Sequence, residues 1–213
     1  MGFSPSTGHQ VTTSIFSNIV DAATGSFVES LTISGVPVAT GTGGGGGGTT
    51  SRSIGIFTFD SVPDDTGSVF LEPYDIKATN DVWKRLVLVF NDTSSRLGFR
   101  GGFSVPADYS SGGEIVVTWT STTTSGATEW DFDYRAVSVG DSFDQTGITE
   151  SLNTSGTAPS SVHERVDTTL TLTSGVSAND EIEFELFRDG TDGGDDMAAA
   201  ALVFRGMFRY TGG

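Results

Sequence analysis

The residues of this chain that are best suited to chemistry are four aspartates in a glycine-rich segment near its end. The segment is RDGTDGGDDM, residues 188–197, and the aspartates are Asp189, Asp192, Asp195 and Asp196. Carboxylate and carbonyl oxygens of such a segment could surround a hard cation such as calcium. The segment lacks the residue order and the closing glutamate of an EF-hand loop, and aspartate and glycine are also ordinary turn residues. The sequence therefore favours a plain acidic turn without a cofactor, with calcium at these four residues as the alternative.

Histidine and cysteine are too scarce for the commonest catalytic and zinc sites. The chain has no cysteine, and its two histidines are His9 and His163. A serine hydrolase triad or a zinc site would depend on His163 alone, because His9 belongs to the N-terminal segment. His163 is followed by Glu164 and Arg165, which indicates a solvated surface histidine.

Acidic residues alternate along two segments, with Asp131 and Asp133 in one and Glu181, Glu183 and Glu185 in the other. Glycoside hydrolysis needs two carboxyl groups that face each other across a cleft. Alternation along one strand is instead what any solvent-facing sheet shows. We therefore expect no catalytic residues, and we predict that the chain is not an enzyme.

Three tryptophans could offer flat surfaces to a sugar ring. Trp83, Trp119 and Trp130 all fall inside segments that read as strands, and packing in the core is the usual role of aromatic residues in such places. A glycan-binding role for these aromatics is therefore the less favoured interpretation.

The segment Glu114–Val137 is the clearest structural signal in the chain. Residues 129–136, EWDFDYRA, alternate charged and apolar side chains, and a period of two places them on opposite faces of a strand. Residues 114–120, EIVVTWT, read as a second strand, and a Ser/Thr/Gly loop connects the two. We expect an antiparallel hairpin, which needs a second layer over its aromatic face because an isolated hairpin is marginal in water.

Other segments with strand-like residue patterns precede and follow this one, and no stretch of ten residues favours a helix. Together they predict about nine strands at roughly 10–15-residue spacing. This pattern predicts an all-β fold, a two-sheet antiparallel β-sandwich of jelly-roll type with an extended N-terminal arm.

The first 40 residues differ in residue pattern from the remainder. Their short apolar clusters cannot bury themselves, and they precede a run of six glycines at residues 43–48, which predicts a flexible tether. We divide the chain into a docking arm (1–40), a tether (41–52) and a sandwich domain (53–213). A terminal strand packed on its own domain is the alternative, but we favour an arm that docks on another subunit. Its expected anchors are Phe16, Ile19, Phe27, Leu31 and Val38.

The net charge of the chain limits the classes of macromolecule that it can bind. The chain has 27 acidic and 11 basic residues and a net charge of −16, whereas nucleic acids and anionic membranes attract clustered lysine and arginine. No window approaches the roughly 18 apolar residues of a membrane span. Residues 1–10 lack the basic and apolar regions of a signal peptide. We expect synthesis in a cytoplasm and neither nucleic acid nor membrane as a partner.

The C-terminal half resembles structural proteins of tailed-bacteriophage virions. The resemblance covers about residues 80–213 and lies in the order of several pieces, which are FSVPADY at 103–109, EIVVTWT at 114–120, WDFDYRAVSVGD at 130–141, FRDGTDGGDD at 187–196 and an aromatic strand ending at Tyr210. FVESLTISGVPVATG at 27–41 also resembles segments near the N-termini of phage fibre and appendage proteins. No catalytic residues come with this likeness.

The resemblance implies a jelly-roll virion protein, commonly a trimer. We expect a capsid decoration (cement) protein that stabilises the head shell by binding the major capsid protein or other virion subunits as a homotrimer. The alternative is a tail or head fibre protein whose sandwich binds a host glycan. In both cases the expected location is the virion, after synthesis in the host cytoplasm.

Overall fold

A computed structural model of the chain describes residues 32–33, 36–37, 50–56, 62–63, 70–75 and 84–213. The chain divides into two units, residues 1–47 and 48–213. The described part of the first unit is a pair of antiparallel strands, β1 (Thr32–Ile33) and β2 (Val36–Pro37). The five expected arm anchors, Phe16, Ile19, Phe27, Leu31 and Val38, lie outside the described residues.

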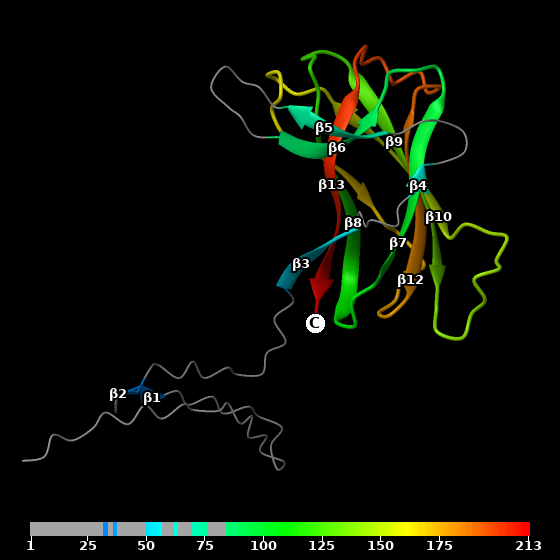
Figure 1. The fold of residues 1–213 in the computed structure, drawn as a ribbon. Coiled ribbons are helices and arrows are strands. Elements are labelled where there is room, and N and C mark those ends of the chain that lie inside the picture. Colours follow the sequence, from blue (N-terminus) through cyan, green and yellow to red (C-terminus); the bar gives the residue numbers. More distant parts are fainter. Residues whose placement is uncertain (1–31, 34–35, 38–49, 57–61, 64–69, 76–83) are drawn as a thin grey trace, which may run out of the picture. The chain divides into compact units, whose positions relative to one another are not determined.

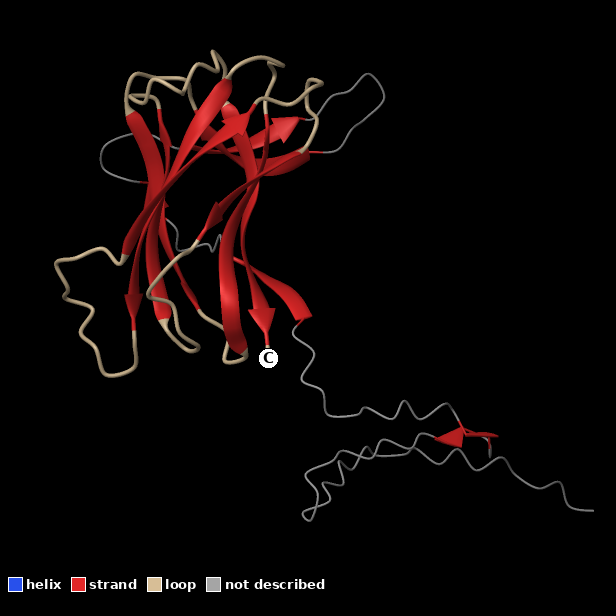
Figure 2. Cartoon of the chain, turned by 180° about the vertical axis from the view of Figure 1, so that it is seen from behind, coloured by secondary structure: helices blue, strands red, loops and turns tan. Residues whose placement is uncertain are grey.

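The described part of the second unit consists of strands and loops (Figure 2). Its strands are β3 (Thr50–Gly55), β4 (Val62–Pro63), β5 (Phe70–Asp75), β6 (Lys84–Phe90), β7 (Arg96–Ser104), β8 (Tyr109–Thr120), β9 (Ala127–Val137), β10 (Glu150–Thr157), β11 (Val166–Thr171), β12 (Glu181–Asp189) and β13 (Ala201–Gly212). Among the described residues there is no helix long and apolar enough to cross a membrane.

The strands form two antiparallel sheets that face each other (Figure 1). One has five strands in the order β10-β9-β12-β7-β4. The other has the order β11-β8-β13-β6-β5, and β3 also pairs with β13. This arrangement confirms the predicted all-β, two-sheet antiparallel sandwich.

The predicted hairpin over Glu114–Val137 is wrong, although both of its strands exist. β8 pairs with β11 and β13, whereas β9 pairs with β10 and β12 in the other sheet. The connecting loop therefore crosses from one sheet to the other. In a hairpin the two aromatic faces would lie side by side and would both need cover, but across the sandwich they cover each other. Trp119 of β8 and Trp130 of β9 meet edge to face with ring centroids 6.0 Å apart.

Apolar and charged side chains alternate along β9 between the core and the outer face, as predicted. Trp130, Phe132 and Tyr134 point between the sheets and are buried. On the neighbouring strand β12, Phe184 stacks on Phe132 with ring centroids 5.2 Å apart. Side chains between these positions, such as Asp133 and Arg135, lie on the outer face of the five-stranded sheet. One face of this sheet is therefore fixed by core packing, and the other is left to carry polar groups.

The sandwich begins earlier than residue 53. Thr50, Ser51 and Arg52 were expected in the tether, but they belong to β3 and pair with the end of β13. Arg52 also forms an ion pair with Asp108. This part of the strand is exposed and polar, so it lacks the apolar period that marks a strand in a sequence.

Glu150, at the start of β10, links the edges of the two sheets. Its carboxylate accepts hydrogen bonds from the backbone N–H of Thr173 at 3.0 Å, from the Thr173 hydroxyl and from the Tyr134 hydroxyl at 2.8 Å. Burial raises the pKa of Glu150, but these hydrogen bonds outweigh it, and the pKa lies below the usual 4.5. Burial and the bond to Glu150 raise the pKa of Tyr134.

We expect Glu150→Gln to weaken the fold at neutral pH and to flatten its acid sensitivity. Because the folded-state pKa is lowered, the stabilisation by Glu150 is complete above pH 4.5 and is lost as pH falls through the folded value. The variant should lose about 1 kcal/mol of unfolding free energy at pH 7. Urea denaturation at pH 7 and at about pH 3 measures both effects. A difference from wild type that does not shrink in acid would contradict this role.

Candidate functional site

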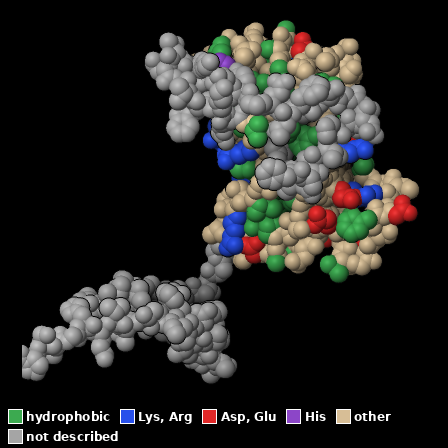
Figure 3. All heavy atoms as spheres, viewed as in Figure 1, with side chains coloured by type: hydrophobic (Ala, Val, Ile, Leu, Met, Phe, Trp, Pro, Cys, Tyr) green, Lys and Arg blue, Asp and Glu red, His purple; other side chains and the backbone are tan. Residues whose placement is uncertain are grey.

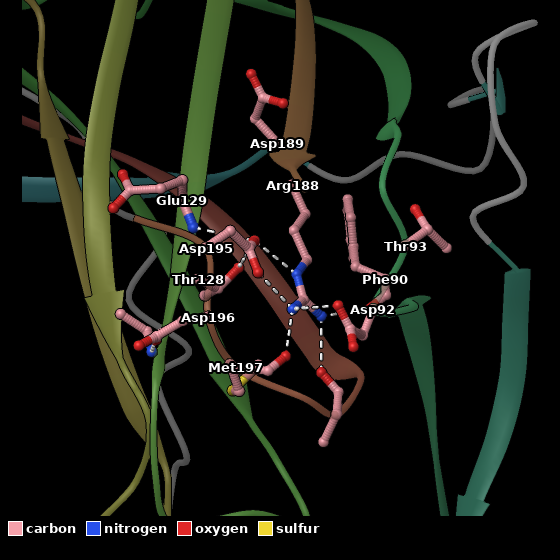
Figure 4. A network of polar contacts seen from close by, with 12 residues as sticks. Phe90, Asp92, Thr93, Thr128, Glu129, Arg188, Asp189, Asp195, Asp196 and Met197 are labelled. Atoms are coloured by element: carbon pink, nitrogen blue, oxygen red, sulfur yellow. Dashed lines mark hydrogen bonds and ion pairs between the residues drawn. The ribbon is translucent and has the colours of Figure 1, made fainter. Parts of the chain in front are cut away.

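The predicted acidic loop is held by a buried arginine. Arg188 ends the inward-facing row of β12, and its side chain is 1% exposed. Its Nε and Nη2 donate to the carboxylate of Asp195 at 2.8 and 2.7 Å (Figure 4). Its remaining N–H groups donate to the carbonyl oxygens of Ala199 at 2.7 Å, Met197 at 2.6 Å and Phe90 at 3.3 Å. A guanidinium group has five N–H donors, and each has a partner here.

The other three aspartates also bind groups of the protein itself. Asp189 accepts hydrogen bonds from the backbone and hydroxyl of Thr191, Asp192 accepts one from the N–H of Gly194, and Asp196 accepts one from the N–H of Ala127 at 2.7 Å. Within the described parts of the chain, no three His, Cys, Asp or Glu side chains are grouped as a metal site requires. Asp195 therefore binds Arg188, and the other three carboxylates bind groups of the turn and of Ala127.

Two of the three tryptophans singled out in the sequence belong to the core. Trp119 and Trp130 are fully buried in the core, and Trp119 Nε1 donates to Thr168 Oγ1 at 2.9 Å. They therefore do not form a sugar platform, and Trp83 lies outside the described residues. His163 lies between β10 and β11 in a left-handed conformation, with φ of 68°.

A groove lies over the outer face of β7, β12 and β9, with a volume of about 750 Å³. Strand register fixes its floor, because Glu183 lies between Gly102 and Arg135, and Glu185 lies between Arg100 and Asp133. Gly102 has no side chain to project into the groove beside Glu183, so the groove is deeper on that side of its floor. The polar lining consists of Arg100, Asp133, Arg135, Glu181, Glu183, Glu185, Gln145 and Thr146.

Ion pairs order the floor of the groove. Arg100 pairs with Glu185, and Arg135 pairs with Glu183 across neighbouring strands. Asp133 accepts a hydrogen bond at 3.0 Å from Arg96, which lies just beyond the groove lining. Arg96 also bridges to Asp131 at 2.9 Å and lies 4.0 Å above the Phe187 ring. Burial raises the pKa of Asp131, although its hydrogen bond with Asn153 and the charge of Arg96 oppose that rise.

One wall of the groove is the loop between β9 and β10, residues 138–149, which exposes apolar side chains. Phe143 is 59% exposed and Ile148 is 62% exposed, and both line the groove. Together with Val139 they make up three of the five exposed large hydrophobic residues in the described part of the chain. Figure 3 shows hydrophobic and acidic side chains gathered at the lower right, where Figure 1 places this loop. Such a concentration of exposed apolar groups is typical of a binding surface.

The loop is tied to the sandwich at its ends and in its middle. The N–H of Thr149 donates to the Tyr134 carbonyl at 2.7 Å, and the Ser138 hydroxyl donates to Asp180 at 2.8 Å. In the middle, Arg135 donates to the carbonyl of Gln145 while it also holds Glu183. The wall that presents Phe143 is therefore connected directly to the floor.

Sequence reasoning missed this groove, although it noted the strands beneath it. The one signal in the sequence was Phe143 and Ile148 within the otherwise polar segment DSFDQTGIT, residues 141–149. That signal does not show which strands the loop covers, because these are distant in sequence.

Comparison with known proteins gives likeness in structure alone. No protein-family model matches the chain, and no curated protein matches its sequence. The xylan-binding CBM22-1 domain of Paenibacillus barcinonensis Xyn10C is similar with a TM-score of 0.42 and 13% identity, over 77% of this chain and 94% of that domain. A family 35 carbohydrate-binding module from Clostridium thermocellum has a TM-score of 0.41 and 10% identity, over 73% of this chain and 97% of the module.

Proposed function

We propose that the sandwich is a non-catalytic saccharide-binding module and that the groove is its binding site. The observation that carries this proposal is Phe143, a largely exposed aromatic ring in the wall of a groove whose floor is made of paired charged groups. A sugar ring has apolar C–H faces and a rim of hydroxyl groups. Phe143 and Ile148 can pack on the C–H face, because aromatic and aliphatic groups gain from burying such surface.

The floor supplies the complementary polar partners. Arg135 offers N–H donors beside the Glu183 carboxylate, and Arg100 does so beside Glu185. A hydroxyl group both donates and accepts, so adjacent sugar hydroxyls can bind a guanidinium and a carboxylate at the same time. Pairing within the protein also fixes these side chains before the ligand arrives, which lowers the ordering cost of binding.

The same pairing favours binding over hydrolysis. A glycosidase needs one carboxyl group that is held protonated and a second that can attack or activate water. In the groove, Glu183, Glu185 and Asp133 are counter-ions of arginines, and Glu181 accepts a hydrogen bond from the Ser104 hydroxyl at 2.6 Å. Carboxylates held in this way act as acceptors for ligand hydroxyls.

The resemblance seen in the sequence supports placing this module on a tailed-bacteriophage virion, as a fibre or appendage protein. The division of the chain between residues 47 and 48 suits a sandwich that an N-terminal segment attaches to other virion subunits. In this setting the groove would face the host surface. A homotrimer would present three such grooves and increase avidity for a repeated glycan.

The test is a glycan array followed by titration of the best saccharide against Phe143→Ala. We expect affinity to fall at least about 10-fold, which corresponds to about 1.4 kcal/mol of binding free energy. Val162→Ala is the matched control, because Val162 is also an exposed apolar residue on a loop but does not line the groove. It should bind like wild type.

Two outcomes would count against the proposal. One is an array without any bound glycan, and the other is a bound glycan whose affinity does not depend on Phe143. The capsid decoration role would be favoured instead by stoichiometric binding to empty phage shells with two properties. This binding would be unchanged in Phe143→Ala and would be lost when residues 1–47 are deleted.

A further inference from the structure

The groove carries an excess of negative charge. Its lining contains four carboxylates, Asp133, Glu181, Glu183 and Glu185, and two guanidinium groups, Arg100 and Arg135. Two positive charges minus four negative charges leave −2 in the groove, within a chain whose net charge is −16. A ligand that brings further negative charge is repelled both locally and by the whole molecule.

Glu181 is the carboxylate most open to a cationic ligand. Glu183 and Glu185 are each neutralised by an arginine of the floor, and Asp133 by Arg96. Glu181 instead accepts a hydrogen bond from the neutral hydroxyl of Ser104, and it forms no ion pair with any described residue. Its carboxylate therefore faces no counter-ion among the described residues and has lone pairs left for a donor.

The apolar wall favours the same kind of ligand. The face of an aromatic ring attracts a cation, and ammonium groups bind over phenylalanine rings. Phe143 and Glu181 line one groove, so a saccharide whose ring packs on Phe143 can place a positively charged substituent in a negative field. Neutral sugars gain only the packing and the hydroxyl contacts, and acidic sugars lose part of that gain to repulsion.

We propose that the groove selects saccharides that carry a free amino group, in preference to neutral and acidic saccharides. This selectivity rests on the proposed saccharide-binding function. It assigns Phe143 to packing on the sugar ring and Glu181 to binding the ammonium group.

The experiment compares three tetrasaccharides by calorimetric titration of the full-length protein. The first is a β-1,4-linked glucosamine tetramer, the second is the same tetramer with every amine acetylated, and the third is a galacturonate tetramer. The titrations are made at about pH 5.5, where the sugar amines are protonated. We expect the free-amine tetramer to bind at least about 5-fold more tightly than the acetylated one, and this preference should shrink as salt rises from about 20 to about 300 mM. The galacturonate tetramer should bind most weakly.

A pair of charge-matched variants assigns the effect to Glu181. Glu181→Gln should weaken binding of the free-amine tetramer about 3- to 5-fold and leave the acetylated tetramer within about 2-fold. Glu164→Gln removes the same charge from an exposed residue outside the groove and should change neither affinity.

The outcomes separate the selectivity from the function on which it rests. If the acetylated or the acidic tetramer binds in a Phe143-dependent way at least as tightly as the free amine, the selectivity is wrong and the saccharide site stands. Tetralysine that binds as tightly as the free-amine tetramer would show a general cation site and overturn the selectivity for saccharides. If no tetramer binds and the glycan array is also empty, both proposals fail.

Discussion

Arg188→Met is expected to lower the free energy of unfolding by about 3–5 kcal/mol, the usual effect of breaking a buried ion pair. The arginine and Asp195 are each 1% exposed at their side chains. Methionine would leave the Asp195 carboxylate unpaired and the carbonyl oxygens of Met197 and Ala199 without these donors. Because segment 190–200 is closed onto β12 by these bonds, it should also become more accessible to proteases.

Urea denaturation of the full chain measures this loss, and two variants make the result specific. Arg165→Met breaks an exposed pair with Asp167 and should cost less than about 1 kcal/mol. The double variant Arg188→Met/Asp195→Leu removes both charges and should recover part of the loss, because no buried charge then remains unpaired. Arg188→Met as stable as wild type, or a double variant no more stable than Arg188→Met, would contradict this description.

The period of two in the sequence predicted which side chains face the core, but not which strands pair. The alternation along residues 129–136 correctly separated Trp130, Phe132 and Tyr134 from the charged face. Pairing depends instead on how two apolar faces can cover each other, and the adjacent strands β8 and β9 solve this by entering different sheets. Two strands that are adjacent in sequence therefore need not pair with each other when a short loop can cross the sandwich.

The strand at residues 84–90 shows a second limit of pattern reading. Its apolar run Leu86–Phe90 is typical of a central strand buried on both faces. β6 does lie between β13 and β5, and Val87 and Phe90 are buried, but Leu86 is among the exposed hydrophobic residues. A continuous apolar run thus indicates that a strand is central more reliably than that each of its residues is covered.

The two polar sites differ in how far the sequence could have revealed them. Arg188 continues the inward row of Ile182, Phe184 and Leu186 along β12 and is followed by four aspartates, so the alternation alone implies an inward arginine near acidic partners. The groove gives no comparable signal. Its floor combines residues of β7, β9 and β12 through strand register, and its wall is a loop without any period. Only the fold brings these parts together.

Arg135→Met should reduce saccharide affinity at least about 10-fold, mainly by releasing the wall of the groove. The guanidinium group holds Glu183 through Nε at 2.9 Å and donates through Nη1 to the carbonyl of Gln145. Methionine keeps much of the packing volume but makes neither bond, so loop 138–149 would lose its central attachment while its ends stay tied. Phe143 would then sample many positions, and ordering it again on binding costs affinity.

Hydrogen exchange distinguishes this positioning role from direct ligand contact. Amide exchange of residues 139–147 should speed up in Arg135→Met before any saccharide is added, because mobile loops open at little free-energy cost. Arg100→Met is the matched control, since Arg100 also lines the groove and pairs with Glu185 on β12 but lies on β7, away from the loop in sequence. It should weaken binding without accelerating exchange in the loop. Arg135→Lys should restore only part of the affinity, because an ammonium group lacks the fork that reaches Glu183 and Gln145 together. Exchange that is unchanged in Arg135→Met would mean that the ends alone fix the loop, and Arg135 would then act only through its own contact with the ligand.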